Sequence, residues 1–497
     1  MKAVFLAVSV FFPILGGIFT AFAKINKRKT YLVILETVSI ITSLLVWLMI
    51  FNKPEGDVNV FWFVERIDIK FHMDGLSMVF AGLVSFLWPL ALLYSMEYME
   101  IEQKEGMIRE KTFFSLYTIT YGVTLGICFA ESLMTMYCFY ELLTLVTVPL
   151  VLHTLSKEAI RAGRTYMYYS LGGAAFGFIA LVFVIVYGDT IDFRYGGVLN
   201  ESLIGTRTNL LRLIYVLGFM GFGVKAAICP LNSWLPKAGV APTPVTALLH
   251  AVAVVKSGAF AIMRLTYYSF GTDIIRDSWA QTTVMIITMV TIVYGCSMAV
   301  KEHHFKRRLA YSTISNLSYI LFGVTIMTPA GLVGALCHLV FHAFMKITSF
   351  FSAGAVICKT GKHYVDELEG EGKRMPKVFA IFTLSSLALM GVPGLSGFVS
   401  KWYLASAAVD SGKTLALFGI GALLVSAILT AIYMLDVVTK AYYPVKKETS
   451  LEEKTEKCDP GWKMLLPLAV FAVIIVILGI HPTPLINIFT NIAEGLL

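Results

Sequence analysis

Hydrophobic runs of about 20 residues recur along almost the whole chain, and each is long enough to cross a lipid bilayer as an α-helix. We count fourteen such runs, centred near residues 13, 41, 87, 120, 143, 175, 220, 254, 288, 317, 345, 393, 425 and 473. One aqueous core could not hide this much apolar surface, because 57% of the 497 residues are hydrophobic and only 14% are charged. The sequence therefore predicts an all-α polytopic membrane protein whose first run is a retained signal anchor.

Positive charges mark one side of the predicted membrane. Of the 40 Lys and Arg residues, 26 fall in odd-numbered loops, counted from the N-terminus, and nine fall in the even-numbered loops and the N-terminus. By the positive-inside rule the odd-numbered loops face the cytoplasm. The sequence thus predicts a multi-pass protein of the cytoplasmic membrane with both termini on the outer face. The basic charge is a topology signal, so we expect no nucleic-acid partner.

Two of the predicted spans are interrupted. Span 7 contains Pro230, and span 12 contains Gly391, Pro393 and Gly394 at its middle. Proline removes a helix hydrogen bond, and unpaired backbone is costly in lipid, so such breaks survive where they line a polar cavity or pack against protein. The two helices are five spans apart and cross in opposite directions, as expected for discontinuous helices of inverted repeats. Two unrelated proline kinks are the alternative.

This pattern predicts a division of the chain within a single membrane domain of residues 1–497. Spans 1–3 occupy residues 1–110 and span 14 occupies residues 460–497. Between them we predict two inverted five-helix repeats, spans 4–8 in residues 111–270 and spans 9–13 in residues 276–442.

Ionisable side chains lie within the predicted spans, where each costs about 2.5 kcal/mol or more. One carboxylate cannot neutralise four lysines, and burial among like charges favours the neutral form of a lysine. A row of such amines and imidazoles is what a proton relay requires. The two histidines and the lysine of span 11 are spaced four residues apart, which places them on one helix face. The candidate relay comprises Glu141, Lys225, His250, Lys256, His338, His342, Lys346 and Lys401.

Simpler interpretations stay open for some of these residues. Glu141 could belong to a buried pair that only fixes helix packing, and His250 could be a satisfied helix contact. We expect Arg264, near the outer end of span 8, to extend its guanidinium to the membrane interface. Glu36 and Asp436 have no assigned role.

The chain shows no pattern for a metal site, a cofactor or a catalytic residue. Its seven cysteines include no C-x-x-C pair. The remaining histidines lie in loops or at span ends, where solvation explains them: His72, His153, His303, His304, His363 and His481.

Four motifs resemble the antiporter-like subunits shared by respiratory complex I, the Mrp-type sodium/proton antiporters and the energy-converting membrane-bound hydrogenases. They are KAAICPLNSWLPKAGVAPTPVTALLHAVAVVKSGAFAIMR (225–264), KRRLAYSTISNLSYILFG (306–323), HLVFHAFMKITSFFSAGAVI (338–357) and DELEGEGKRMP (366–376). The resemblance covers roughly residues 74 to 440 and implies fourteen helices with spans 7 and 12 discontinuous.

The resemblance also implies roles for the candidate residues. Glu141 and Lys225 would form the pair of a first half-channel, and Lys256 with His250 would link it to the centre. The histidines and the lysine of span 11 would continue the axis, and Lys401 would lead to a second half-channel. A lysine at 401 is similar to the D-type Mrp antiporter subunit, to the hydrogenase subunit and to the largest complex I member, but the last carries a long C-terminal lateral helix that we do not expect here.

We therefore expect a proton-translocating subunit of a multi-subunit membrane complex, with other integral membrane subunits as partners. A D-like Mrp antiporter subunit or a hydrogenase context comes first, and a complex I membrane arm (NADH-quinone oxidoreductase) is an alternative. Na⁺ as the coupled ion and a hydrogenase or other redox arm as a partner stay open. A structural anchor for a redox arm is a second alternative, and a membrane acyltransferase using His338 or His342 as its base is disfavoured by the lack of a carboxylate or hydroxyl partner at a suitable spacing.

Overall fold

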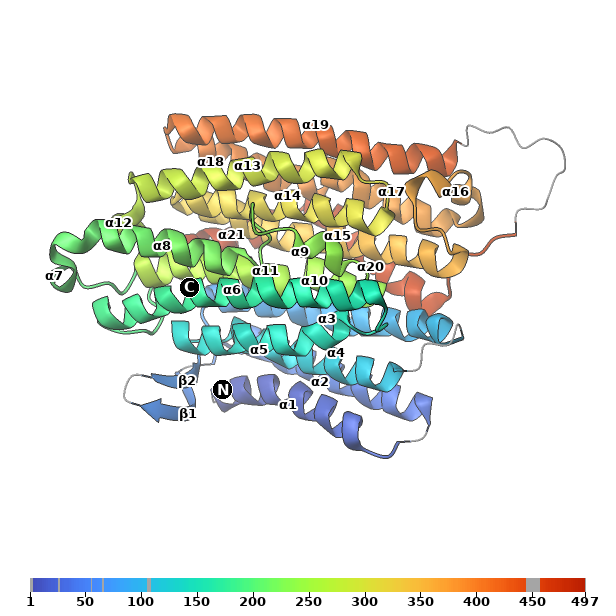
Figure 1. Ribbon diagram of the computed structural model, residues 1–497, viewed down its shortest axis with the longest axis horizontal. Coiled ribbons are helices and arrows are strands. Elements are labelled where there is room, and N and C mark those ends of the chain that lie inside the picture. Colours follow the sequence, from blue (N-terminus) through green and yellow to red (C-terminus); the bar gives the residue numbers. More distant parts are fainter. Residues whose placement is uncertain are drawn as a thin grey trace.

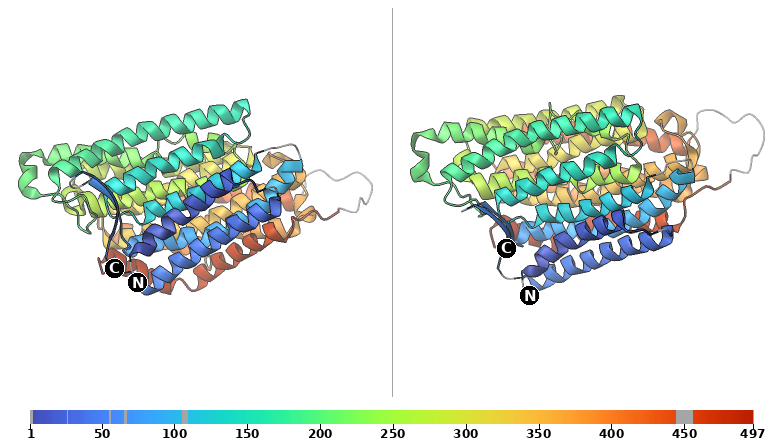
Figure 2. Two further views of the ribbon diagram at one scale, coloured as in Figure 1. Left: turned by 90° about the horizontal axis from the view of Figure 1, so that it is seen from below. Right: turned by 60° about the horizontal axis from the view of Figure 1, so that its bottom comes forward.

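The computed structural model describes residues 3–25, 27–54, 56–64, 67–104, 109–443 and 456–496. Long helices lie side by side along the longest axis of the molecule, as Figure 1 and the two views of Figure 2 show. The first part of the chain comprises α1 (Val4–Phe22), α2 (Arg28–Asn52), the antiparallel hairpin β1 (Val58–Val64) and β2 (Ile67–Phe71), and α3 (Gly75–Lys104).

The middle part of the chain comprises α4 (Glu110–Cys128), α5 (Leu133–Val151), α6 (Lys157–Tyr187), α7 (Glu201–Ile204), the 3₁₀-helix η1 (Gly205–Arg207), α8 (Thr208–Gly223), α9 (Trp234–Ala238), α10 (Thr243–Ala251), α11 (Val254–Met263) and the π-helix η2 (Arg264–Phe270).

The last part comprises α12 (Thr272–Ile275), α13 (Trp279–Lys301), α14 (Phe305–Ile326), α15 (Pro329–Thr360), the 3₁₀-helix η3 (Val365–Glu367), α16 (Glu371–Arg374), α17 (Pro376–Met390), α18 (Ser396–Asp410), α19 (Thr414–Tyr442), α20 (Trp462–Ile480) and α21 (Thr483–Ala493). Apart from the hairpin and a few isolated bridges, the regular structure of the described residues is helical.

Eleven helical segments of the described chain are long and apolar enough to cross a membrane, which confirms an all-α polytopic membrane protein. The other three predicted spans correspond to α4, to α8 and to the pair α17 and α18. Polar residues lower the hydropathy of α4, and breaks shorten the other helices. The predicted fourteen spans thus include three that length and composition alone do not identify.

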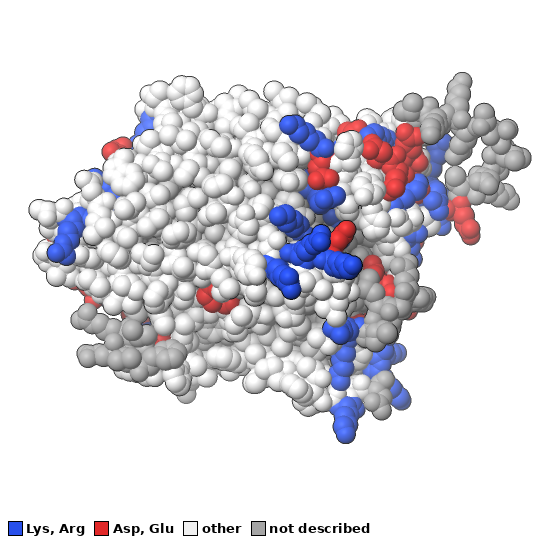
Figure 3. Space-filling view, viewed as in Figure 1, with Lys and Arg blue, Asp and Glu red and all other residues white. Residues whose placement is uncertain are grey.

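Basic side chains gather at one end of the bundle. In Figure 3 the Lys and Arg residues of the visible face cluster at the right-hand end, where α2 begins and α19 ends in Figure 1. Both chain ends are marked towards the opposite end in Figure 1. This distribution agrees with the charge count along the sequence.

Helix α15 runs unbroken through the centre of the molecule. Thr328 caps its first turn, with its hydroxyl accepting from the Gly331 amide, and Pro329 starts the helix with a favourable φ. Gly361 ends it in a left-handed conformation. Because α15 packs against α3, α10, α14, α17, α18, α20 and α21, every residue from Gly331 to Ile357 is buried.

The span that begins with α8 breaks in the region of Pro230, between Gly223 and Trp234. Side chains satisfy the backbone groups that the break frees. The Trp234 indole donates to the Val224 carbonyl at 2.8 Å, and the Tyr140 hydroxyl donates to the Phe222 carbonyl at 2.9 Å. Protein side chains thus satisfy these two carbonyls, while Pro230 itself is exposed at the surface of the bundle.

The span formed by α17 and α18 breaks between Met390 and Ser396, at the glycines that the sequence singled out. Gly391 (φ 95°) and Gly394 (φ 87°) both adopt backbone conformations that L-residues rarely take. In Figure 1, α8 leads towards the basic end whereas α17 leads away from it, so the two interrupted spans run in opposite directions.

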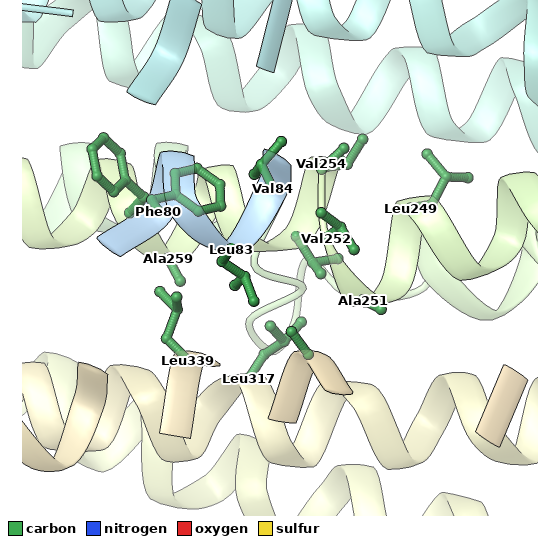
Figure 4. Close-up of a cluster of buried hydrophobic side chains, with 14 of the residues drawn as sticks. Phe80, Leu83, Val84, Leu249, Ala251, Val252, Val254, Ala259, Leu317 and Leu339 are labelled. Carbon is green, nitrogen blue, oxygen red and sulfur yellow. The ribbon is translucent and has the colours of Figure 1, made fainter. Parts of the chain in front are cut away.

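A third break lies between α10 and α11, where the sequence carries neither proline nor glycine. Val252 leaves the helical conformation (φ -130°, ψ -67°), whereas Ala253 stays in the right-handed helical region. The Ala253 amide donates to the Leu248 carbonyl at 2.9 Å, five residues back rather than four. Figure 4 shows this connection among buried apolar side chains of α3, α14 and α15, including Phe80, Leu317 and Leu339. The break separates His250 from Lys256, which sit on opposite sides of it.

Candidate proton relay

The first pair of the candidate relay joins α5 to the broken span that begins with α8. The Lys225 ammonium lies 3.9 Å from Glu141 Oε1, donates to the Tyr140 carbonyl, and sits 3.4 Å from the centroid of the Tyr140 ring. Lys225 is fully buried, while Glu141 is partly exposed and lines a cavity between α5 and α6. Glu141 is thus the more accessible partner of the pair, beside a cavity with a mostly apolar lining, and Lys225 is the buried one.

The centre of the relay joins α11 to α15 by direct contact. Lys256 Nζ lies 2.8 Å from His342 Nδ1, and the rings of His342 and His338 stack with their centroids 5.5 Å apart. All three side chains are fully buried. The Nε2 atoms of both histidines have no hydrogen-bond partner among the described residues. Buried polar nitrogens of this kind are normally satisfied by internal water, which would bridge the ring-to-ring gap.

Two residues for which the sequence predicts no role connect this centre to Lys401. Ser400 Oγ lies 2.9 Å from His338 Nδ1, and the Tyr319 ring lies 5.1 Å from the His338 ring. The same Tyr319 ring is 5.6 Å from the Lys401 ammonium, measured to the ring centroid. Tyr319 falls within the motif 306–323, whereas Ser400 is adjacent to Lys401 and has no signal of its own.

Lys401 closes the break of span 12. Its ammonium donates to the carbonyls of Leu389 and Met390 at 2.7 and 2.9 Å. These are terminal carbonyls of α17 that the break leaves without helical partners, and the negative end of a helix favours a cation. Lys401 is partly exposed, so it resembles Glu141 in standing at an edge of the buried axis.

Lys346 does not point along the Lys256–His342 contact. Its ammonium donates to Ser312 Oγ at 2.6 Å and to the Leu309 carbonyl at 3.3 Å, both on α14. Ser312 in turn lies 2.6 Å from the Tyr433 hydroxyl of α19. The evenly spaced residues of α15 therefore contact different partners. His338 and His342 lie on the Lys256 side, whereas Lys346 contacts the hydroxyl branch, which we define as Ser312 and Tyr433, towards α19.

His250 lies on the other side of the α10–α11 break from Lys256. Both of its ring nitrogens are buried and have no hydrogen-bond partner in the described part of the chain, and its ring packs 4.8 Å from Phe350. The described side chains thus leave both ring nitrogens of His250 to internal water. The alternative that His250 is a helix contact stays open.

The backbone of α11, which carries Lys256, comes very close to the broken segment that carries Lys225. A Cβ added at Gly258 of α11 would lie 2.5 Å from the Ala226 amide and 2.9 Å from the Lys225 carbonyl carbon. Only a glycine lets α11 lie this close to the broken segment that carries Lys225. Sequence spacing gives no indication of this contact.

Arg264 differs from the sequence-based expectation. Its guanidinium is buried rather than extended to the interface, and it binds Asp74 through contacts of 2.5 and 2.7 Å. The Asp74 carboxylate and the faces of the Phe193 and Tyr268 rings stabilise the buried guanidinium charge, so it does not need water at the membrane interface. Asp436, unassigned from the sequence, pairs with Arg308 at 2.7 Å.

Comparison with known proteins identifies the family. Residues 130–430 match the family model described as NADH:quinone oxidoreductase/Mrp antiporter, TM, and residues 62–108 match NADH-Ubiquinone oxidoreductase (complex I), chain 5 N-terminus. NAD(P)H-quinone oxidoreductase chain 4 2 of Picosynechococcus sp. is 29% identical over 507 residues, covering 99% of this chain and 93% of that protein.

Two solved structures share the fold over nearly the whole chain. One is a chain of the Mrp complex from Dietzia sp., with a TM-score of 0.84 and 20% identity, covering 99% of this chain and 97% of that one. The other belongs to the membrane-bound sulfane sulfur reductase, an archaeal respiratory membrane complex, with the same TM-score, identity and coverage. The family that the sequence motifs predict is confirmed: this chain belongs to the NADH:quinone oxidoreductase/Mrp antiporter transmembrane family.

Proposed function

We propose that this chain is a proton-translocating, antiporter-like subunit of a multi-subunit membrane complex. In this proposal protons move between two inverted repeats, residues 111–270 and 276–442, within a fourteen-span domain. The observation that carries it is the 2.8 Å contact between Lys256 Nζ and His342 Nδ1. This contact joins a helix of the first repeat to a helix of the second through two groups that can exchange a proton.

The geometry supports a sequence of transfers. Lys225 responds to the charge of Glu141, because an opposite charge favours the ammonium form and its loss favours release. Lys256 and His342 pass the proton directly, and water beside the unpaired Nε2 atoms carries it on to His338 and towards Lys401. In this proposal an ion gradient or a partner module supplies the driving force.

We further propose a place in the cytoplasmic membrane with the basic end of the bundle inside and both termini outside. The partners are other integral membrane subunits, as in the Mrp complex and the quinone oxidoreductases that match this chain. Relatives of both kinds match over almost the whole chain, so the proposal does not rank the Mrp or hydrogenase context above complex I. A redox arm is the partner in the hydrogenase and complex I contexts, and Na⁺ is the coupled ion in the Mrp context.

Reconstitution of the complex into vesicles with a pH-sensitive dye tests the proposal. Lys256→Ala and Lys256→Arg should both abolish proton movement, because alanine removes the group and arginine does not release its proton. Lys413→Ala is the matched control, since Lys413 pairs with Asp277 at 2.8 Å in the 411–413 connection, away from the relay. Repeating the assay with and without Na⁺ distinguishes sodium exchange from a purely redox-coupled pump.

Normal proton movement in the Lys256→Arg variant would overturn the relay and leave the structural anchor. An anchor predicts that both Lys256 variants assemble and support the activity of the whole complex. Loss in both variants with intact assembly, and no loss in the Lys413→Ala control, supports translocation through this chain.

A further inference from the structure

We propose that this chain carries a Zn²⁺ site, formed by Asp57, His72 and Glu131, at the end of the bundle that also holds the β-hairpin. The site lies outside the candidate relay and does not depend on the proposed function. Among the described residues these three form a group whose ligand atoms all lie within 4.8 Å of one another. The sequence alone predicts no role for His72 beyond solvation.

Backbone pairing brings the three residues together. Val58 of β1 pairs with Phe71 of β2, so Asp57 and His72 occupy the next opposed positions of the antiparallel ladder. Phe71 also pairs with Ala130, and the Glu131 amide donates to the Lys70 carbonyl at 3.1 Å. Opposed and diagonal positions on one face of such a ladder place side chains within reach of each other. The ligands therefore come from three adjoining backbone segments rather than from a flexible loop.

The side chains already approach one another. His72 Nδ1 lies 2.8 Å from Asp57 Oδ1 and 4.0 Å from Glu131 Oε2. Ligands of a tetrahedral Zn²⁺ at about 2.0–2.2 Å are roughly 3.3–3.5 Å apart, so small side-chain rotations complete the set. One imidazole and two carboxylates leave a fourth position for water, which is an open zinc site.

Charge favours a cation at this position. Neither Asp57 nor Glu131 has a nitrogen of a described Lys or Arg residue within 4.0 Å. The nearby cations are held by other carboxylates: Lys70 pairs with Asp192 at 3.0 Å, and Arg264 pairs with Asp74. The two carboxylates of the site thus face each other across one imidazole, and a divalent ion would neutralise them. Imidazole among the ligands favours zinc over calcium or magnesium.

Zinc binding to the purified full-length chain tests this proposal. We expect about one Zn²⁺ per chain, measured by equilibrium with a chromogenic chelator, and a Co²⁺ absorption spectrum of four-coordinate type. His72→Ala and Glu131→Gln should each weaken binding by more than about tenfold, since even outer-shell changes cost 10–100-fold. Asp57→Asn, at a half-exposed position, provides a third variant with little effect on folding.

His303→Ala is the matched control. His303 Nδ1 lies 2.9 Å from Asp366, much as His72 lies from Asp57, but Lys440 occupies the other side of that carboxylate at 2.6 Å. Zinc binding should be unchanged in this variant. Absence of binding in the wild type, unchanged binding in all three site variants, or equal loss in the control would each overturn the site.

Discussion

At the scale of single residues, Lys346 differs from the other lysines of the candidate relay because its ammonium donates to the hydroxyl of Ser312. Lys346→Met keeps the volume of the side chain without its charge, and Lys346→Arg keeps the charge without ready proton release. We expect both variants to lose proton movement in vesicles, because both lack a titratable amine beside Ser312. Transport at the wild-type rate in the arginine variant alone would show that Lys346 acts only as a fixed charge.

Glu131 gives the proposed zinc site a pH dependence. Burial raises the pKa of the Glu131 carboxyl to about 8, and the charge of Asp57 also acts to raise it. Below that pKa a proton competes with the metal, so zinc affinity should rise as the pH increases from about 6 towards 8 and level off above it. Proton release per bound Zn²⁺, measured by calorimetry in two buffers, should be lower in Glu131→Gln. Equal release in both proteins would contradict this role.

At the scale of elements, Gly258 sets the distance between α11 and the broken segment that carries Lys225. Gly258→Val would place side-chain atoms against the Ala226 amide and the Lys225 backbone, at a cost of about 1–3 kcal/mol. We expect lower thermal stability in detergent and loss of proton movement. Gly172→Ala is the control, because a Cβ there meets nothing within 4 Å. Equal effects of the two substitutions would contradict the close approach.

Sequence reasoning finds the interrupted spans that contain Pro230 and Gly391, because proline and glycine have local backbone rules. It does not find the break at Val252 and Ala253, where both residues favour regular structure and tertiary packing alone explains the departure. In the candidate relay, too, residue type reveals some features and tertiary packing alone determines others. Charge at membrane depth identifies Lys256 and His342, whereas their 2.8 Å contact depends on how α11 and α15 pack.

Sequence reasoning also fails where a partner lies far along the chain. Arg264 is buried because Asp74 lies beside it, 190 residues earlier, and no local pattern pairs the two. The hairpin β1–β2 and helix α21 are not predicted from the sequence, for a different reason. Both are short elements that lie beside long apolar runs. Short elements of this kind give a weaker periodic signal than a membrane span does.

At the scale of the whole molecule, the asymmetry of basic charge predicts the orientation in the membrane. Cys458 lies in the connection between α19 and α20 at the basic end, so a membrane-impermeant thiol reagent added to intact cells should leave it unlabelled. Ser202→Cys, exposed at the opposite end, should be labelled under the same conditions. Labelling of Cys458 from outside, with Ser202→Cys protected, would reverse the orientation.

The unbroken course of α15 has a mechanical consequence. Helix α15 is continuous over 32 residues and is buried around the two histidines and the lysine. The axial distances between His338, His342 and Lys346 are therefore fixed by the helix geometry. If the proposed relay switches between open and closed connections, segments other than α15 supply the movement. The three interruptions next to Lys225, Lys256 and Lys401 are the natural pivots, because short segments there can turn without unwinding a whole helix. Lys225, Lys256 and Lys401 thus each lie beside an interruption, whereas His338, His342 and Lys346 lie on the continuous helix.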